Sequence, residues 1–356
     1  MPESNCLQNV AAERLDLFCR EALARVGVST EHSRLTADVL VTTDSWGVFT
    51  HGSKLLGGYL NRLKSGGLRT DAEPGVAAEG PAWAIVDGHS VLGQVTSTFA
   101  MKKAIELARG AGVAYVGVRN SCHFGAAGYY TSLAAKEGMV GLAMANDRPS
   151  VAAPGSRGAI IGTNPFSYAV PAGEHDPILL DMAISTVAGG KVYAAHQRGE
   201  AIAADWIIGP DGLPTTDGSL YPEKASLAPM SAHKGYGLGL MIESLSAALS
   251  GAAMTWSVGS WIFGDASKPT DHGAAFLAMN VAAMGSLEAF QGRIDALIRE
   301  IHAAPRAHGV DRLYVPGEME WERRRAALRD GIPLPADVRA ALVEVGTGFD
   351  IALPWS

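Results

Sequence analysis

The chain has 356 residues, of which 47% are hydrophobic and 18% are charged, a composition typical of a globular protein with one large or two ordinary domains. Its formal net charge is -7 and it has no long basic run, which argues against a nucleic-acid-binding surface. No stretch of about 18 apolar residues is free of charge, so we expect no membrane span.

Cysteine usage indicates a reducing compartment. Cys6, Cys19 and Cys122 are odd in number, widely spaced and without a C-x-x-C pair, so neither a disulfide framework nor a zinc site is expected. Residues 1–7 lack the basic segment and apolar core of a signal peptide. We therefore expect a cytoplasmic protein that binds no metal.

The first 75 residues are predicted to form an N-terminal helical region. Apolar residues recur at helical spacing in residues 8–26, and Ser29 or Thr30 can cap a second helix. A third helix is expected from Gly52 to Ser65, where Gly66 and Gly67 end it.

Strands and helices alternate from about residue 83, which predicts a central α/β domain over residues 76–285. Strands are expected at residues 83–86, 113–118, 139–144, 167–170 and 178–180, with helices at 96–109 and 126–136. This alternation favours a largely parallel sheet covered on both faces. Residues 286–356 are expected to form a C-terminal helical region, with a short strand at 313–315, that packs with the N-terminal one.

Two histidines lie where such a fold places chemistry. The strand at 113–118 ends in a polar turn that carries His123, and a helix follows. Ligands of open α/β sheets gather where strands end, and a histidine there can exchange a proton near neutral pH. His51 lies in the segment Thr50-His51-Gly52 before another helix. Together they indicate a proton-transfer site built from separate parts of the chain.

Several familiar motifs are absent. The chain has no G-x-G-x-x-G after its first strand and no G-x-x-x-x-G-K-[ST], so a standard dinucleotide-binding Rossmann unit is not supported. It also lacks H-E-x-x-H and G-x-S-x-G.

The chain resembles the type-2 malate/L-lactate dehydrogenase family, which includes ureidoglycolate and sulfolactate dehydrogenases and piperideine-2-carboxylate reductases. The resemblance covers roughly residues 8–335 in the family's order. Its landmarks are Thr50-His51-Gly52 before a helix with Tyr59, Ser121-Cys122-His123-Phe124-Gly125, Gly162-Thr163-Asn164-Pro165, Asp181-Met182-Ala183, Gly190-Lys191-Val192, Gly212-Leu213-Pro214-Thr215-Thr216-Asp217, His233-Lys234-Gly235-Tyr236-Gly237 and Tyr314-Val315-Pro316-Gly317-Glu318.

The resemblance implies an oxidoreductase that uses NAD or NADP. It implies an α/β fold of a non-Rossmann type, in which helices from both chain ends flank a central sheet, and a homodimer. The implied substrates are small 2-hydroxy or 2-oxo acids of the malate or lactate kind. Cyclic imino acids are the alternative substrate class.

The resemblance also implies roles for individual residues. His123 matches a position assigned as proton acceptor, and His51 matches one assigned as proton donor. Only one proton moves, so one histidine transfers it while the other fixes the substrate oxygen, and which does which stays open. Substrate contacts are expected from Thr50, Lys54, Tyr59 and Asn164, although Thr50 can also act as a helix N-cap and Asn164 can instead hold a turn.

The cofactor is expected to contact three segments and one single residue. These are Asp181-Met182-Ala183 at a strand end, Lys234-Gly235 at a helix start, Pro316-Gly317-Glu318, and Asp147 on the nicotinamide side. A helix N-terminus with a lysine suits a pyrophosphate group.

One residue departs from the family pattern. Most members carry arginine four residues after the motif histidine, where it would bind a carboxylate, and this chain has Leu55 there. Either Lys54, which points about 100° away around a helix, or another cation such as Arg148 takes over, or the substrate differs.

Two other functions are weighed against the dehydrogenase. A member that binds ligand but has lost the chemistry is suggested by Leu55. A hydrolase that uses His123 with Ser121 is disfavoured because no third triad residue is evident.

Overall fold

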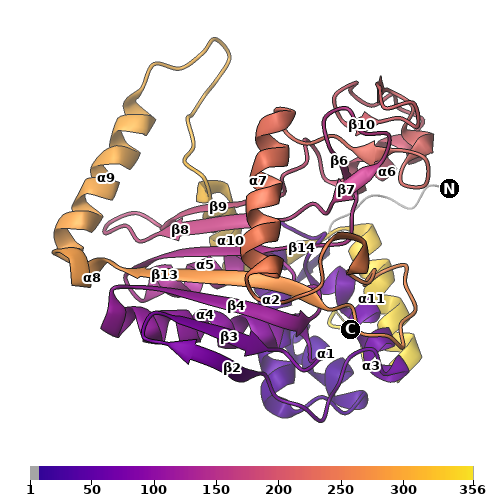
Figure 1. Cartoon of the computed structure of the whole chain (residues 1–356), viewed down its shortest axis with the longest axis horizontal. Helices are drawn as coiled ribbons and strands as arrows, with labels where there is room; N and C mark the ends of the chain where they lie inside the picture. Colours follow the sequence, from indigo (N-terminus) through magenta and orange to yellow (C-terminus); the bar gives the residue numbers. More distant parts are fainter. Residues whose placement is uncertain (1–7, 356) are drawn as a thin grey trace.

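The computed structural model describes residues 8–355, shown in Figure 1. Cys6 and the segment tested for a signal peptide lie outside the described residues. Among the described residues, no helix is both long enough and apolar enough to cross a bilayer.

A seven-stranded sheet forms the centre of the molecule (Figure 1). Its strands lie in the order β2 (Gly75–Gly80), β3 (Trp83–Asp87), β4 (Val113–Ser121), β13 (His272–Asn280), β5 (Met139–Ala145), β8 (Phe166–Val170) and β9 (Ile178–Met182). Only β3 and β4 pair in parallel, and the other neighbours are antiparallel. The prediction of a largely parallel sheet is therefore wrong.

The pairs β2–β3, β5–β8 and β8–β9 are antiparallel in their own right, and strand β13 adds two more. It comes late in the chain and inserts between β4 and β5, antiparallel to both. The β4–α5–β5 unit alone would have made a parallel pair. Residues 273–276 of β13 are fully buried, and the strand brings His272 opposite Ser121, the last residue of β4.

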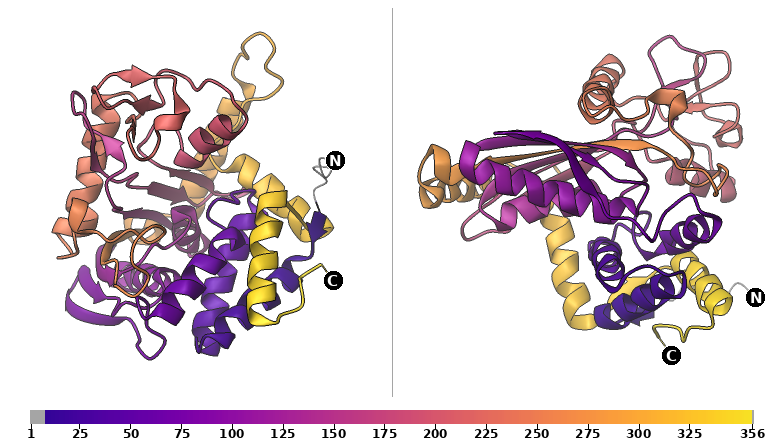
Figure 2. Two further views of the ribbon diagram at one scale, coloured as in Figure 1. Left: turned by 90° about the vertical axis from the view of Figure 1, so that its right-hand side faces the viewer. Right: turned by 60° about the horizontal axis from the view of Figure 1, so that its bottom comes forward.

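Helices α4 (Gly93–Ala111) and α5 (Ala127–Lys136) cover one face of the sheet (Figure 2). Their alanine-rich faces pack on Val116, Ala143 and Phe276 in one core cluster. Small residues let these helices approach the strands closely.

A second layer lies over the opposite face of the sheet. It contains α7 (His233–Glu243), the π-helical turn η3 (Ser244–Ala248), α6 (Gly189–Gln197) and a small five-stranded sheet. The strands of that sheet lie in the order β11 (Pro214–Thr215), β10 (Ile207–Ile208), β12 (Ser226–Leu227), β6 (Val151–Ala152) and β7 (Ala159–Ile161). Short 3-10 turns, η2 (Gly218–Leu220) and η4 (Thr255–Ser257), complete this part.

The two chain ends share one core. Helices α1 (Ala12–Arg25), α2 (Thr30–Ser45) and α3 (Leu56–Ser65) pack with α10 (Glu318–Asp330) and α11 (Ala336–Phe349). Strand β1 (Gln8–Val10) pairs with β14 (Ile332–Leu334). Two local expectations are thus corrected, because residues 8–10 form a strand before α1, and the C-terminal strand lies at 332–334 instead of 313–315.

Helix α9 (Leu287–Ala303) lies apart from the terminal helices, beyond the short helix α8 (Val281–Met284), as Figure 1 shows. Asp295 ties it to the loop after β8 by accepting hydrogen bonds from the backbone N–H groups of residues 173–175. Of the 17 residues of α9, only Asp295 and Ile298 are buried.

Candidate active site

His123 follows β4 and is enclosed by aromatic rings. Its ring stacks on that of Trp261 with centroids 4.1 Å apart and planes 9° apart. The hydroxyl of Tyr59 lies 2.8 Å from His123 Nδ1. Burial, together with the neighbouring His51, lowers the pKa of His123 to about 3. The imidazole is therefore neutral at physiological pH.

The loop that carries His123 depends on a close backbone approach. Gly93, the first residue of α4, faces the carbonyl groups of Cys122 and His123. A Cβ at position 93 would lie 2.4 Å from the Cys122 oxygen and 2.5 Å from that of His123. Only glycine allows α4 to start this close to the catalytic loop.

His51 comes from the turn between α2 and the 3-10 turn η1 (Ser53–Leu55). Its ring centroid lies 5.8 Å from that of His123, and burial lowers its pKa as well. The hydroxyl of Thr50 lies 2.9 Å from His51 Nδ1. The prediction that Thr50 caps the helix is wrong, because Gly52 and Leu55 precede η1 and α3 and neither helix has a side-chain cap.

A buried carboxylate of α2 holds this turn in place. Asp44 Oδ2 accepts a hydrogen bond of 2.9 Å from the backbone N–H of Ser53. A Cβ at Gly52 would lie 1.8 Å from Asp44 Oδ1, so only glycine fits beside the carboxylate. Burial raises the pKa of Asp44 to about 7.

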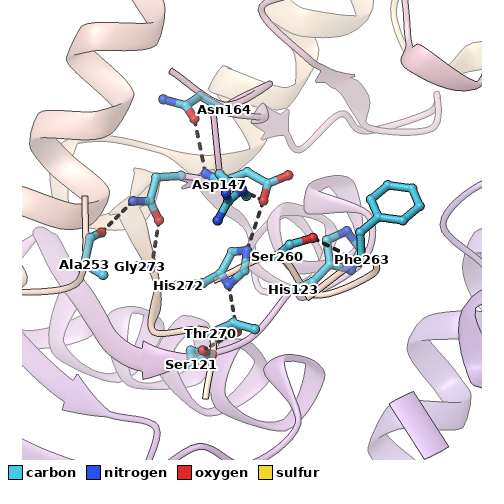
Figure 3. A network of polar contacts seen from close by, with 12 residues as sticks. Ser121, His123, Asp147, Asn164, Ala253, Ser260, Phe263, Thr270, His272 and Gly273 are labelled. Atoms are coloured by element: carbon cyan, nitrogen blue, oxygen red, sulfur yellow. Dashed lines mark hydrogen bonds and ion pairs between the residues drawn. The ribbon is translucent and has the colours of Figure 1, made fainter. Parts of the chain in front are cut away.

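Asp147 joins the site from the loop after β5, and Figure 3 shows it between Asn164 and His272. Its Oδ1 lies 3.1 Å from His272 Nε2 and accepts the Arg148 N–H at 2.7 Å. Desolvation raises the pKa of Asp147, but the hydrogen bond and charge of His272 outweigh it and hold the pKa below its usual value. Asp147 is therefore ionised.

Asn164 holds the backbone of Asp147 in place. Its Oδ1 accepts the Asp147 N–H at 3.3 Å, while its Nδ2 donates to the Gly239 carbonyl and to Glu243, each at 3.0 Å. Its side chain is fully buried, and its backbone has a φ of 35°. In this structure the Asn164 amide thus supports a turn, and a contact with substrate remains a prediction.

The cations expected near the site lie in different surroundings. Lys54 forms an ion pair of 2.7 Å with Asp337 of α11. Leu55 packs against the core shared by the two chain ends. The guanidinium of Arg148 stacks on Trp256 at 5.0 Å, and no carboxylate within residues 8–355 lies at ion-pair distance from it.

The three segments predicted to bind the cofactor lie along β9, with Pro316–Glu318 beside its first residues and Lys234–Gly235 connected to the chain beyond its last residue. Leu179 N donates to the Pro316 carbonyl at 2.9 Å, and a Cβ at Gly317 would lie 2.6 Å from the Cβ of Leu179. Beyond Asp181–Ala183, Ile184 accepts from Met230 N at 2.9 Å, and Met230 accepts from Gly235 N at 3.0 Å.

The side chains of these segments differ in availability. Asp181 Oδ2 accepts the Gly128 N–H at 2.7 Å. Glu318 forms ion pairs with His302, at 3.0 Å, and Arg312, and it borders a cavity of about 430 Å³. Lys234, in the first turn of α7, is exposed. The arrangement fits a dinucleotide by backbone groups and Lys234, with Glu318 holding its own loop.

Sequence reasoning found both histidines but missed three residues that build the site: Trp261, Asp44 and His272. Trp261 lies in an irregular segment, and Asp44 looks like any residue of an amphipathic helix. His272 was expected to be structural or superficial. Its one signal is its place just before an apolar run that forms a buried strand.

Comparison with known proteins decides the family. The profile described as malate/L-lactate dehydrogenase matches residues 10–343. The chain belongs to this family. It is 36% identical to a malate dehydrogenase of Pyrococcus abyssi, over 94% of this chain and 93% of that protein. It is 32% identical to the NAD(+)-dependent ureidoglycolate dehydrogenase of Escherichia coli K12, over 98% and 99%.

The fold agrees with this membership. A crystal structure of a malate dehydrogenase from Entamoeba histolytica superposes with a TM-score of 0.91 at 32% identity, over 98% of this chain and 99% of that one. As a member of a dehydrogenase family that aligns over nearly its whole length, the chain is an oxidoreductase.

Proposed function

We propose that this protein is an NAD(P)-dependent dehydrogenase that interconverts a small 2-hydroxy acid and its 2-oxo acid, with a histidine moving the proton. The observation that carries the proposal is the histidine pair. His51 and His123 come from different parts of the chain, yet their rings lie 5.8 Å apart in a buried site. Oxidation of a hydroxyl needs one base on its proton.

His123 is the proposed base. The tautomer with hydrogen on Nδ1 donates to the Tyr59 oxygen and leaves the Nε2 lone pair free. Because burial keeps the ring neutral, His123 can accept the substrate proton at neutral pH. The bound nicotinamide would accept the hydride. The negative charge of Asp147 raises the pKa of His123 and thus stabilises the imidazolium that forms.

His51 is the proposed partner that orients the substrate oxygen. With Thr50 on Nδ1, its Nε2 is the nitrogen left for the substrate. Burial lowers its pKa, so it can orient the oxygen as a neutral hydrogen-bonding group without competing for the proton.

Arg148 is the proposed partner of the substrate carboxylate. Lys54 is held by Asp337, whereas the guanidinium of Arg148, which follows Asp147 directly, has only the Trp256 ring as a partner among the described residues. An arginine can bind a carboxylate through two parallel hydrogen bonds.

We further propose that the protein functions as a homodimer and that α9 lies in the interface. Leu297 is 45% exposed on this helix and Met284, just before it, is 66% exposed. Exposed apolar side chains on one projecting element are typical of an association surface.

The test is turnover by the purified protein. NAD⁺ and NADP⁺ are each supplied with malate, lactate, sulfolactate and ureidoglycolate, and NADH and NADPH with 2-oxo acids and cyclic imino acids, while absorbance is followed. We expect one 2-hydroxy or 2-oxo acid pair to react, and kcat/KM for oxidation to stay level down to about pH 5, because His123 is already deprotonated there. Reaction with cyclic imino acids alone would replace the proposed substrate class.

A substitution of His123 tests its assignment as the base. His123→Asn should lower kcat by about 10²- to 10⁴-fold, the usual contribution of general acid–base catalysis. His32→Asn is the matched control, because His32 is also buried, at 4% exposed, and pairs with a carboxylate, Glu73, at 2.8 Å. Wild-type kcat in His123→Asn would refute the assignment.

A further inference from the structure

A chain of hydrogen-bonding groups runs from the end of β4 to Asp147. The Thr270 hydroxyl lies 3.3 Å from the Ser121 carbonyl and 2.9 Å from His272 Nδ1. His272 Nε2 continues the chain to Asp147, as Figure 3 shows. The His272 side chain is only 4% exposed, and the strand pairing of β13 with β4 fixes its backbone.

This chain fixes the orientation of the Asp147 carboxylate. An ionised carboxylate only accepts hydrogen bonds, so His272 Nε2 carries the hydrogen in this contact. Oδ1 accepts from both His272 and the Arg148 N–H. Oδ2 accepts no hydrogen bond from the described part of the chain, and the side chain is 28% exposed. One oxygen is therefore held by protein, and the other is available to the site.

The charged and titratable groups that face Asp147 come from several elements. They are His51 from the turn before η1, Cys122 and His123 from the loop after β4, Arg148 beside it, Tyr221 after η2 and His272 of β13. Tyr221 and Cys122 are neutral at physiological pH, because burial raises the pKa of each. The electrostatic interactions that shift the pKa of His123 are thus those with His51, Asp147 and His272, and Asp147 also acts on His51.

We propose that His272 is a positioning residue of this active site: by holding Asp147 it sets the electrostatic field in which His123 takes up the substrate proton and His51 orients the substrate oxygen. The kinetic part of this inference rests on the proposed function. Burial alone would give His272 only a packing role. The role proposed here rests on its contact with the Asp147 carboxylate.

The two members of the pair act on the catalytic histidines in opposite directions. The charge of Asp147 raises the pKa of both His51 and His123, whereas the charge of His272 lowers that of His123. Replacing either member would therefore move the titration of the base, and the two replacements would move it in opposite senses.

The test compares His272→Gln and Asp147→Asn with the wild type. In each we would record kcat/KM for oxidation from about pH 2.5 to 9, because burial lowers the pKa of His123 to about 3. We would also record, without substrate or cofactor, the NMR titration of the His51 and His123 ring signals, assigned from their own substitutions. We expect the acidic limb and the His123 titration to move up by about one pH unit in His272→Gln and down by a similar amount in Asp147→Asn.

Two further variants complete the design. His32→Asn should move neither the pH profile nor the ring titrations. The double variant His272→Gln/Asp147→Asn should titrate between the two single variants, because the two charges that it removes act on His123 in opposite directions. The inference fails if His272→Gln folds with the wild-type titration, or if both single variants shift it the same way. The ring titrations are read even if no tested acid is oxidised, so loss of the proposed function and loss of this inference are distinguishable.

Discussion

Tyr59 is fully buried, so its hydroxyl needs a hydrogen-bond partner within the protein. It lies 2.8 Å from His123 Nδ1, and the Tyr59 ring stacks on Trp261 at 5.3 Å. Desolvation raises its pKa well above the ordinary value, which keeps it a neutral phenol. Tyr59 thus anchors the His123 ring through Nδ1, and its expected contact with substrate stays a prediction.

Replacing Tyr59 by phenylalanine should separate this role from packing. The ring remains, but His123 Nδ1 loses its partner, so we expect kcat to fall roughly tenfold and stability to fall by about 1 kcal/mol. Steady-state kinetics and thermal unfolding measure the two effects.

Tyr115→Phe is the matched control for that variant. The Tyr115 hydroxyl donates to the Leu245 carbonyl at 2.6 Å, a structural hydrogen bond, so its loss should lower stability by a similar amount and leave kcat unchanged. Equal kcat losses in both variants would show that Tyr59 acts only through packing.

At the residue scale, the sequence indicates the two histidines of the candidate site better than the residues that hold them in place. His51 and His123 stand in short motifs at the ends of elements, where position alone indicates chemistry. Trp261 and His272 reach the site through tertiary structure, one from an irregular segment and one from an inserted strand. Neither position produces a pattern in the sequence. The spacing of residue types indicates which residues are neighbours within an element, and it does not indicate which strands pair in a sheet.

At the scale of elements, Asp44 links α2 to the turn that carries His51. A buried carboxylate with one hydrogen bond from Ser53 N has a pKa of about 7, against 3.8 for the ordinary group. Because the folded-state pKa is the higher one, the protonated form is favoured by folding. The stabilising contribution is complete below pH 3.8 and is lost as the pH rises towards 7.

Asp44→Asn should therefore change how stability depends on pH. Asparagine stays neutral and can still accept the Ser53 N–H, so the variant should gain on the wild type as the pH rises from 5 to 8, with each pKa unit corresponding to about 1.4 kcal/mol. Chemical denaturation at a series of pH values gives this difference.

Asp295→Asn should show the opposite dependence of stability on pH. Desolvation raises the pKa of Asp295, but the three backbone N–H groups that it accepts outweigh this and keep the pKa low. That variant should lose stability at neutral pH, and the loss should shrink in acid. A constant difference between Asp44→Asn and the wild type across pH 5–8 would contradict the buried-charge explanation.

The element scale also shows where the predicted fold went wrong. Alternating strands and helices correctly indicated β3, β4, β5, α4 and α5, yet the sheet is mostly antiparallel, because β2–β3, β5–β8 and β8–β9 pair antiparallel and β13 separates β4 from β5. A strand that enters a sheet from a distant part of the sequence leaves no trace in local periodicity. The insertion of β13 also places His272 at the site.

At the scale of the whole molecule, α9 is the element least explained by a single chain. The terminal helices bury their apolar faces in a shared core, whereas α9 projects beyond the sheet (Figure 1) and keeps Leu297 exposed. Stable homodimers bury about 800 Å² or more per partner, and a helix of 17 residues with its flanking segments can supply a large part of that.

Leu297→Glu together with Met284→Glu should thus weaken self-association. We expect the wild type to be a dimer by light scattering coupled to gel filtration at micromolar concentration, and the double variant to be a folded monomer, because two carboxylates cannot be buried unpaired in an apolar interface. Leu17→Glu is the matched control, since Leu17 is 60% exposed on α1 and should leave the mass unchanged. A dimer that survives both substitutions would place the interface elsewhere, and a monomeric wild type would contradict the proposed dimer.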